Sequence, residues 1–242
     1  ARTVLLDALE ALGPHRNSVV VVGSHAIYLR VGQADLAVAP HTTDGDLAID
    51  PLNLGRTPPI EQALMQAGFA PKAKDSVGVW VTHRPTLRNP RTEVAIDLLV
   101  PASVSPGKGR RAARLEGHHA HAARIVRGLD GVIVDSDVMS VGSLDPADSR
   151  SFDMRIAGPA AMLVAKMHKI DDRSGTKRSS DKDALDVLRI LSGTSTDDLA
   201  HRMHRVTVSD KSADVAQEAL EMFRQQFASR AGQGVEMIVR AV

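Results

Sequence analysis

The chain has 242 residues, which is enough for one large domain or two small ones with a sizeable core. Its formal net charge is only +1, so an argument for a nucleic-acid partner must rest on local clusters of charge. The sequence contains no cysteine, which excludes disulfides and thiolate metal sites and suits a cytoplasmic protein. No apolar run approaches the roughly 18 residues that span a bilayer, so no membrane partner is expected.

The first half of the chain alternates helical and strand patterns. Residues 1–12 have helical spacing that ends at Gly13-Pro14, and the β-branched run 19–22 predicts a strand buried on both faces. Gly23-Ser24 then leads into a short helix over 26–31. The other expected elements are a helix over 60–67, closed by Gly68, and strands at 45–50, 77–81 and 93–100.

The second half becomes helical from Gly158 onward, after two short strands expected at 131–134 and 152–156. Pro159 suits the first turn of a helix that runs to about Asp171. Three further helices are expected, beginning near 180 and covering roughly 195–205 and 210–230. The sequence therefore predicts an α/β (α+β) fold, with an α/β domain over 1–156 and a helical domain over 157–242.

Two aspartates stand one residue apart at the start of the 45–50 strand. At this spacing the side chains of Asp44 and Asp46 project from the same face, so both carboxylates can reach one divalent cation. Magnesium-dependent phosphoryl transfer needs that arrangement. The pair is also compatible with a solvated turn, in which Asp44-Gly45 supplies the turn chemistry.

Two further features flank the acidic pair. Gly23-Ser24 at a strand-to-helix junction lets backbone N–H groups and a hydroxyl approach a phosphate, although many strands enter helices in this way. Asp97 lies opposite the aliphatic face of its strand, which Val94, Ile96 and Leu98 form. It is either a solvent-exposed acid or a third carboxylate that deprotonates an attacking hydroxyl.

In this order the features resemble the nucleotidyltransferase superfamily related to DNA polymerase β. The resemblance implies a nucleotidyltransferase-type mixed sheet in which Gly23 and Ser24 hold an NTP. It also implies that Asp44 and Asp46 bind Mg²⁺ or Mn²⁺ and that Asp97 completes the site as a metal ligand or base. The stretch "VGQADLAVAPHT" makes the gap from Ser24 to Asp44 longer than is usual in the family. We interpret it as an insertion that either forms a lid or places the acidic pair differently.

The helical half resembles the AbiEii-type nucleotidyltransferase toxins, including the mycobacterial toxins of that kind. That group carries a lysine in a helix after the sheet, which Lys166 matches, and a Lys/Arg-Asp-x-x-Asp motif, which residues 182–186 match. Lys166 lies in an apolar stretch and needs a partner: it either contacts the triphosphate or extends to the solvent at a domain edge. Asp183 either holds Lys166 or binds the nucleotide sugar. Asp186 is either a surface acid or a partner for Arg189.

A basic segment, 108–127, is the candidate for RNA-backbone contact, with a solvated loop and helix face as the alternative. Its histidines lack ligands at zinc spacing, so no zinc site is predicted. The cations assigned to RNA binding are Lys108, Arg110, Arg111 and Arg114.

These observations favour a Mg²⁺-dependent nucleotidyltransferase toxin of the cytoplasm that transfers NMP from an NTP to RNA. The resemblance implies the 3′ end of tRNA as the acceptor and a protein antitoxin as a partner. The predicted catalytic residues are Asp44, Asp46, Asp97, Lys166 and Asp183. Two alternatives remain: a transferase that modifies a small molecule such as an antibiotic, and a non-catalytic nucleotide- or RNA-binding protein on the same fold.

Overall fold

The computed structural model describes residues 1–32, 42–85, 91–105, 111–176 and 181–242. Most of the expected insertion therefore lies outside the described residues. The contacts between residues divide the chain into two compact units. The first unit is Ala1–His25, Thr42–Val126 and Asp137–Ile156, and the second is Ala26–His41, Arg127–Ser136 and Ala157–Val242.

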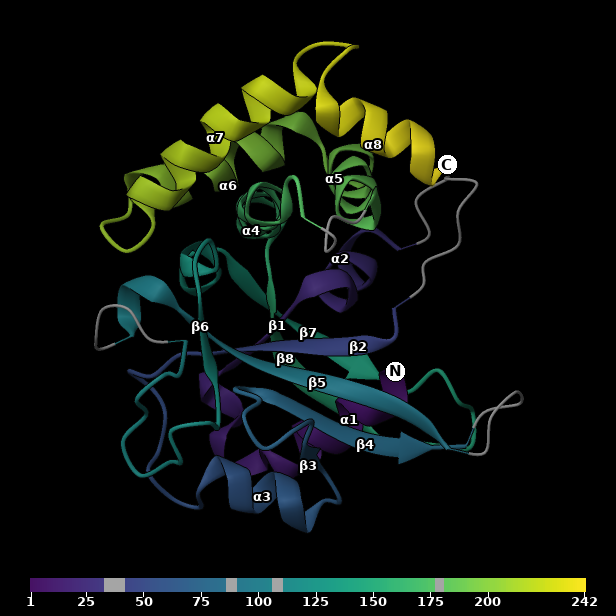
Figure 1. The fold of residues 1–242 in the computed structure, drawn as a ribbon, viewed down its shortest axis with the longest axis vertical. Coiled ribbons are helices and arrows are strands. Elements are labelled where there is room, and N and C mark those ends of the chain that lie inside the picture. Colours follow the sequence, from purple (N-terminus) through teal and green to yellow (C-terminus); the bar gives the residue numbers. More distant parts are fainter. Residues whose placement is uncertain (33–41, 86–90, 106–110, 177–180) are drawn as a thin grey trace. The chain divides into compact units, whose positions relative to one another are not determined.

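A mixed sheet forms the centre of the first unit (Figure 1). Its strand order in the described residues is β3-β4-β5-β2-β1-β8-β7, with β6 paired to β5. Strand β1 is antiparallel to β2, whereas the β1–β8, β2–β5 and β5–β6 pairs are parallel. The strands are β1 (Val19–Val22), β2 (Asp44–Ile49), β3 (Ala70–Pro71), β4 (Val79–Arg84), β5 (Thr92–Pro101), β6 (Arg124–Val126), β7 (Ser136–Gly142) and β8 (Ser151–Ala157).

One face of the sheet packs on helix α1 (Arg2–Ala11), which also contacts α3 (Ile60–Gln66) (Figure 1). A methyl group added to Gly45 would lie 2.6 Å from Ile96 Cδ1 and 3.5 Å from Leu5 Cδ1, so this face of β2 is the core face. Leu47 and Leu98 on the same face are fully buried. Because strand side chains alternate, the even-numbered residues of β2 face the other side of the sheet.

The second unit is a helical bundle around α4 (Pro159–Arg173), which contacts α5, α6 and α7 (Figure 1). The buried face of α4 includes Leu163, Val164, Met167 and Ile170, and it shares one apolar cluster with residues of the surrounding helices. The other helices of this unit are α2 (Gly23–Val31, from Ala26 onward), α5 (Asp181–Gly193), α6 (Thr196–Val208), α7 (Ala213–Phe227) and α8 (Gln233–Ala241). None of the helices within the described ranges combines the length and apolar character of a bilayer-spanning segment.

The predicted mixed α/β fold is confirmed, but one expected strand is wrong. Residues 131–134 were expected to be extended, and Asp130–Ile133 instead forms a 3₁₀ helix. Its Gly131 packs closely on two helices: an added Cβ would lie 3.1 Å from Val206 and 3.4 Å from the Ala161 backbone. Asp130 also accepts a hydrogen bond from the Gly128 N–H, which favours a turn. The strands β3, β6 and β7 and the helix α8 were not expected.

Histidine hydrogen bonds hold the segment 55–60 in the first unit. The Ile60 N–H donates to Nδ1 of His118 at 3.1 Å, so the proton is on Nε2, which lies 3.0 Å from the Gly55 carbonyl oxygen. His15 Nε2 lies 2.7 Å from the Pro58 carbonyl oxygen, and the two imidazole rings meet edge to face. Burial lowers the pKa of His118 below its usual value, so the neutral ring is the native form.

This hydrogen-bonding pattern predicts that the protein loses stability as the pH falls below about 6.5. In that range His118 binds a proton more readily in the unfolded chain than in the folded chain. Its contribution to the free energy of unfolding is therefore complete above about pH 6.5 and is lost as the pH falls toward its lowered folded-state pKa. The substitution His118→Gln should flatten the dependence of the free energy of unfolding on pH between about 5 and 7, measured by urea denaturation. His83→Gln, at an exposed position of β4, is the matched control. An unchanged slope in His118→Gln would contradict this prediction.

Candidate active site

The three candidate carboxylates lie on one face of the sheet, opposite to its core face. Asp44 and Asp46 flank Gly45, and a Cβ added to Gly45 would point into the core. Both aspartate side chains therefore project from the other side of β2. In the parallel pairing of β2 with β5, Asp46 is the register partner of Asp97. Neighbours in register project from the same face, so the sheet places Asp97 beside the acidic pair.

The Gly-Ser turn lies directly against the acidic pair. Val22 of β1 pairs with Asp46, and the chain turns at the next residue, Gly23, with φ of +67°. A Cβ on Gly23 would lie 2.1 Å from Oδ2 of Asp46, so only glycine fits both the backbone conformation and the space. Helix α2 begins at Gly23, which brings its first N–H groups and the mostly buried Ser24 to this end of β1.

Two neighbours of the carboxylates were not assigned to the site from sequence. The Thr42 hydroxyl donates to Oδ1 of Asp44 at 2.8 Å. The guanidinium of Arg124, on β6, donates to Oδ2 of Asp97 and forms an ion pair with it. Arg124 falls within the basic segment 108–127, and nothing in the local sequence pattern identifies β6 as a neighbour of β5.

The carboxylates fit a divalent cation as a pair of ligands rather than as a closed protein cage. Among the described residues, no group of three or more histidine, aspartate and glutamate side chains is arranged to hold a metal ion. Asp97 pairs with Arg124, and Asp44 accepts a hydrogen bond from Thr42. Mg²⁺ commonly binds through one or two carboxylates and completes its octahedron with waters and substrate phosphates.

Lys166 and the Asp-x-x-Asp motif meet inside the second unit. Nζ of Lys166 donates to Asp183 at 2.8 Å and to Asp186 at 2.7 Å, and all three side chains are almost completely buried. Asp186 also accepts a hydrogen bond from Arg189 at 3.1 Å, so it is an internal partner of Arg189 and not a surface acid. The guanidinium of Arg189 in turn lies 5.3 Å from the ring centroid of Tyr28 on α2.

The charges in this cluster stabilise one another. Burial disfavours the Lys166 ammonium, but the carboxylates of Asp186 and Asp183 outweigh that effect and raise its pKa above the usual lysine value. Burial also disfavours the Asp183 carboxylate, whereas Lys166, Lys169 and Arg173 together hold its pKa below the usual aspartate value. Both groups therefore remain charged at neutral pH.

The structure describes only part of the basic segment. Lys108 and Arg110 lie outside the described residues, whereas Arg111 and Arg114 are exposed side chains of the first unit. His119 and His121 form an edge-to-face pair with 5.3 Å between the ring centroids. The exposed arginines are compatible with the predicted RNA contact, whereas Lys166 belongs to the other unit.

The buried cluster predicts a large effect of one lysine and a small effect of its neighbour. Lys166→Met leaves two buried carboxylates without their shared ammonium, which should lower the free energy of unfolding by about 3–5 kcal/mol. Lys169→Met is the matched control, because Lys169 pairs with the same Asp183 at 3.3 Å but has a side chain that is 38% exposed. That substitution should cost less than about 1 kcal/mol, since solvent screens an exposed pair. If urea denaturation shows that both variants lose the same free energy of unfolding, burial does not determine the strength of these pairs.

The chain was compared with protein families, curated proteins and solved structures. No curated protein matches at a significant level. A solved structure of an antigenic nucleotidyltransferase-like protein from Paracoccidioides brasiliensis is similar at 13% identity and TM-score 0.49, covering 97% of this chain and 89% of that one. The antibiotic-resistance factor ANT(2″)-Ia is similar at 11% identity and TM-score 0.43, covering 91% and 97%. The family described as "Nucleotidyltransferase" matches residues 2–208, and the chain therefore belongs to this family and is a transferase that uses an NTP.

Proposed function

We propose that the protein transfers a nucleoside monophosphate at the site formed by Gly23, Ser24, Asp44, Asp46 and Asp97. The observation that carries this proposal is the contact of the Gly23 backbone with the Asp46 carboxylate. It supports a site in which the phosphate-binding start of a helix and two metal-binding carboxylates act on the same triphosphate.

In the proposed reaction, an acceptor hydroxyl attacks the α-phosphorus of the NTP. A new P–O bond to the acceptor forms, the bond between the α-phosphorus and the bridging oxygen breaks, and pyrophosphate leaves. Asp44 and Asp46 would hold Mg²⁺ or Mn²⁺, which would neutralise charge on the phosphate oxygens. The N–H groups at the start of α2 and the Ser24 hydroxyl would bind the triphosphate. Asp97 would accept the proton of the hydroxyl or act as a further ligand, and Arg124 beside it would balance the charge.

We propose that the acceptor is RNA and that the specific target is the 3′ end of tRNA. We further propose that the reaction inhibits growth and that an antitoxin neutralises it. Two observations support an RNA acceptor: the exposed Arg111 and Arg114 in the basic segment, and the resemblance of the helical half to the AbiEii-type toxins. The contacts of Lys166 with Asp183 and Asp186 favour a role in holding α4 and α5 together over a direct contact with the triphosphate.

The acidic pair provides the test of this proposal. Purified protein incubated with each labelled NTP, Mg²⁺ and total RNA should label RNA, and Asp44→Asn or Asp46→Asn should reduce the rate by about 100-fold or more, the effect of removing one preorganised electrostatic group. Asp153→Asn, which removes an exposed acid from β8 in the same unit, should label as the wild type does. The proposal fails if Asp46→Asn retains full activity.

The acceptor and the biological role have their own experiments. Replacing RNA by hydroxylated antibiotics tests the small-molecule alternative, which NTP-dependent inactivation of the antibiotic would establish. Tight binding of NTP without release of pyrophosphate would establish the non-catalytic alternative. Growth arrest on induction of the wild type, but not of Asp46→Asn, would support the toxin role.

The close approach at Gly23 yields a separate prediction. In Gly23→Ala the added Cβ would occupy the position of the Asp46 carboxylate and displace it, which should lower the transfer rate on the order of 100-fold. Gly32→Ala is the matched control, because Gly32 at the other end of α2 has a similar φ of +60°, and no atom of the described residues lies within 4 Å of an added Cβ. Both variants carry the same kind of backbone strain, so a similar loss of activity in both would show that the contact with Asp46 is irrelevant.

A further inference from the structure

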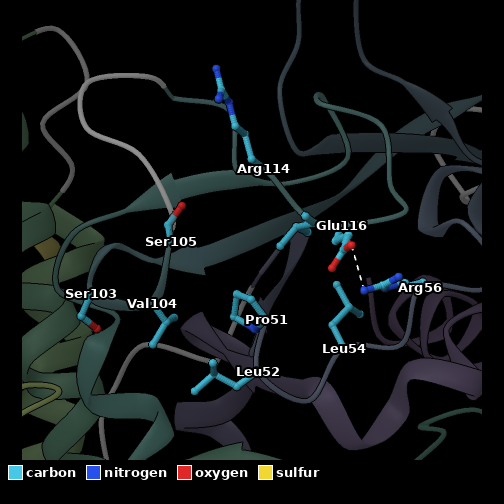
Figure 2. Close-up of a pocket in the computed structure, with 10 residues that line it drawn as sticks. Pro51, Leu52, Leu54, Arg56, Ser103, Val104, Ser105, Arg114 and Glu116 are labelled. Carbon is cyan, nitrogen blue, oxygen red and sulfur yellow. Dashed lines mark ion pairs between the residues drawn. The ribbon is translucent and has the colours of Figure 1, made fainter.

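A pocket of about 450 Å³ opens in the first unit beyond the carboxyl ends of β2 and β5 (Figure 2). Its lining comes from three segments: residues that follow β2, residues that follow β5, and Arg114 to Glu116. Figure 2 shows Ser103–Ser105 and Glu116 on opposite sides, with Pro51, Leu52 and Leu54 between them. None of these residues belongs to the proposed catalytic site.

The walls of the pocket are fixed to each other. Arg56 and Glu116 form an ion pair of 2.8 Å across the pocket wall (Figure 2). Next to it, Gly117 has φ of +84°, and a Cβ there would lie 2.7 Å from the Arg56 carbonyl oxygen. The hydrogen bonds of His118 to Gly55 and Ile60 hold the same two segments together. The pocket is therefore largely preformed, as binding sites usually are.

The lining combines an apolar surface with a cation. Leu52 is 69% exposed and contributes much of the apolar surface. Arg56 is paired with Glu116, whereas Arg114 is exposed and has no ion pair among the described residues. The lining thus carries one excess positive charge, which suits an anion with an apolar body.

The pocket lies within reach of the carboxylates along the same strands. Pro51 is five positions after Asp46, so at about 3.3 Å per residue the two are at most roughly 17 Å apart. A short single strand of nucleic acid spans such a distance, and each of its nucleotides offers one phosphate, one sugar and one base. A nucleotide therefore matches the cation and the apolar surface better than an inorganic anion does.

We propose that this pocket binds one nucleotide of the RNA acceptor, upstream of the 3′-terminal nucleotide that reacts. Arg114 pairs with its phosphate, and Leu52 and Leu54 contact the sugar and base. The identity of the acceptor as RNA rests on the proposed function, whereas the pocket can be tested without catalysis.

The experiment measures binding of a short fluorescent single-stranded RNA by anisotropy, without NTP. Arg114→Gln and Leu52→Asp should each weaken binding about tenfold, and Arg114→Gln should reduce the slope of log affinity against log salt by about one. Two matched controls should stay within about twofold of the wild type: Arg230→Gln removes an exposed arginine of the second unit, and Leu144→Asp adds the same charge at a leucine that is 78% exposed.

The outcomes separate the pocket from the transfer reaction. Equal binding by Arg114→Gln, Leu52→Asp and the controls would overturn the pocket proposal, as would a wild-type protein that binds no RNA. If the wild type labels RNA while the pocket variants bind it normally, only the pocket proposal fails. If the pocket variants bind RNA weakly while the wild type labels nothing, the pocket proposal stands and the proposed transfer fails.

Discussion

The close approach of Gly23 to the Asp46 carboxylate is the constraint on which the candidate site depends. Strand β1 consists of four buried valines between β2 and β8, so its register with β2 cannot slip without exposing apolar side chains. That register places Val22 opposite Asp46 and forces the chain to turn at the next residue, against the carboxylate. The turn is possible only because glycine has no Cβ, and it starts α2 beside the acidic pair.

Local patterns were sufficient to predict the parts of the site that depend on strand geometry. The alternation along β5 predicted that Asp97 faces away from Val94, Ile96 and Leu98, and those three side chains are buried. A two-residue spacing predicted that Asp44 and Asp46 share one face of β2, because side chains alternate in any strand. The need of a buried lysine for a partner was likewise clear from the apolar helix around Lys166.

Contacts between segments distant in sequence were not accessible to this reasoning. The ion pair of Arg124 with Asp97 depends on β6, a strand of three residues that is too short to show a period. The expected strand at 131–134 failed because apolar residues also suit a buried 3₁₀ turn, and the packing of Gly131 on Ala161 and Val206 decides between them. Asp183 and Asp186 lay close in sequence to several cations, and only the packing of α4 on α5 selects Lys166 for both.

The buried charges of the second unit are best understood as a way to fix geometry. An ion pair in a protein interior gains little over apolar side chains of the same volume, because desolvation offsets the attraction, but it tolerates few alternative arrangements. Here Asp186 joins Lys166 of α4 to Arg189 of α5, and Arg189 stacks on Tyr28. Tyr28 lies on α2, the helix that begins at Gly23. The charged cluster therefore restrains the part of α2 that belongs to the second unit.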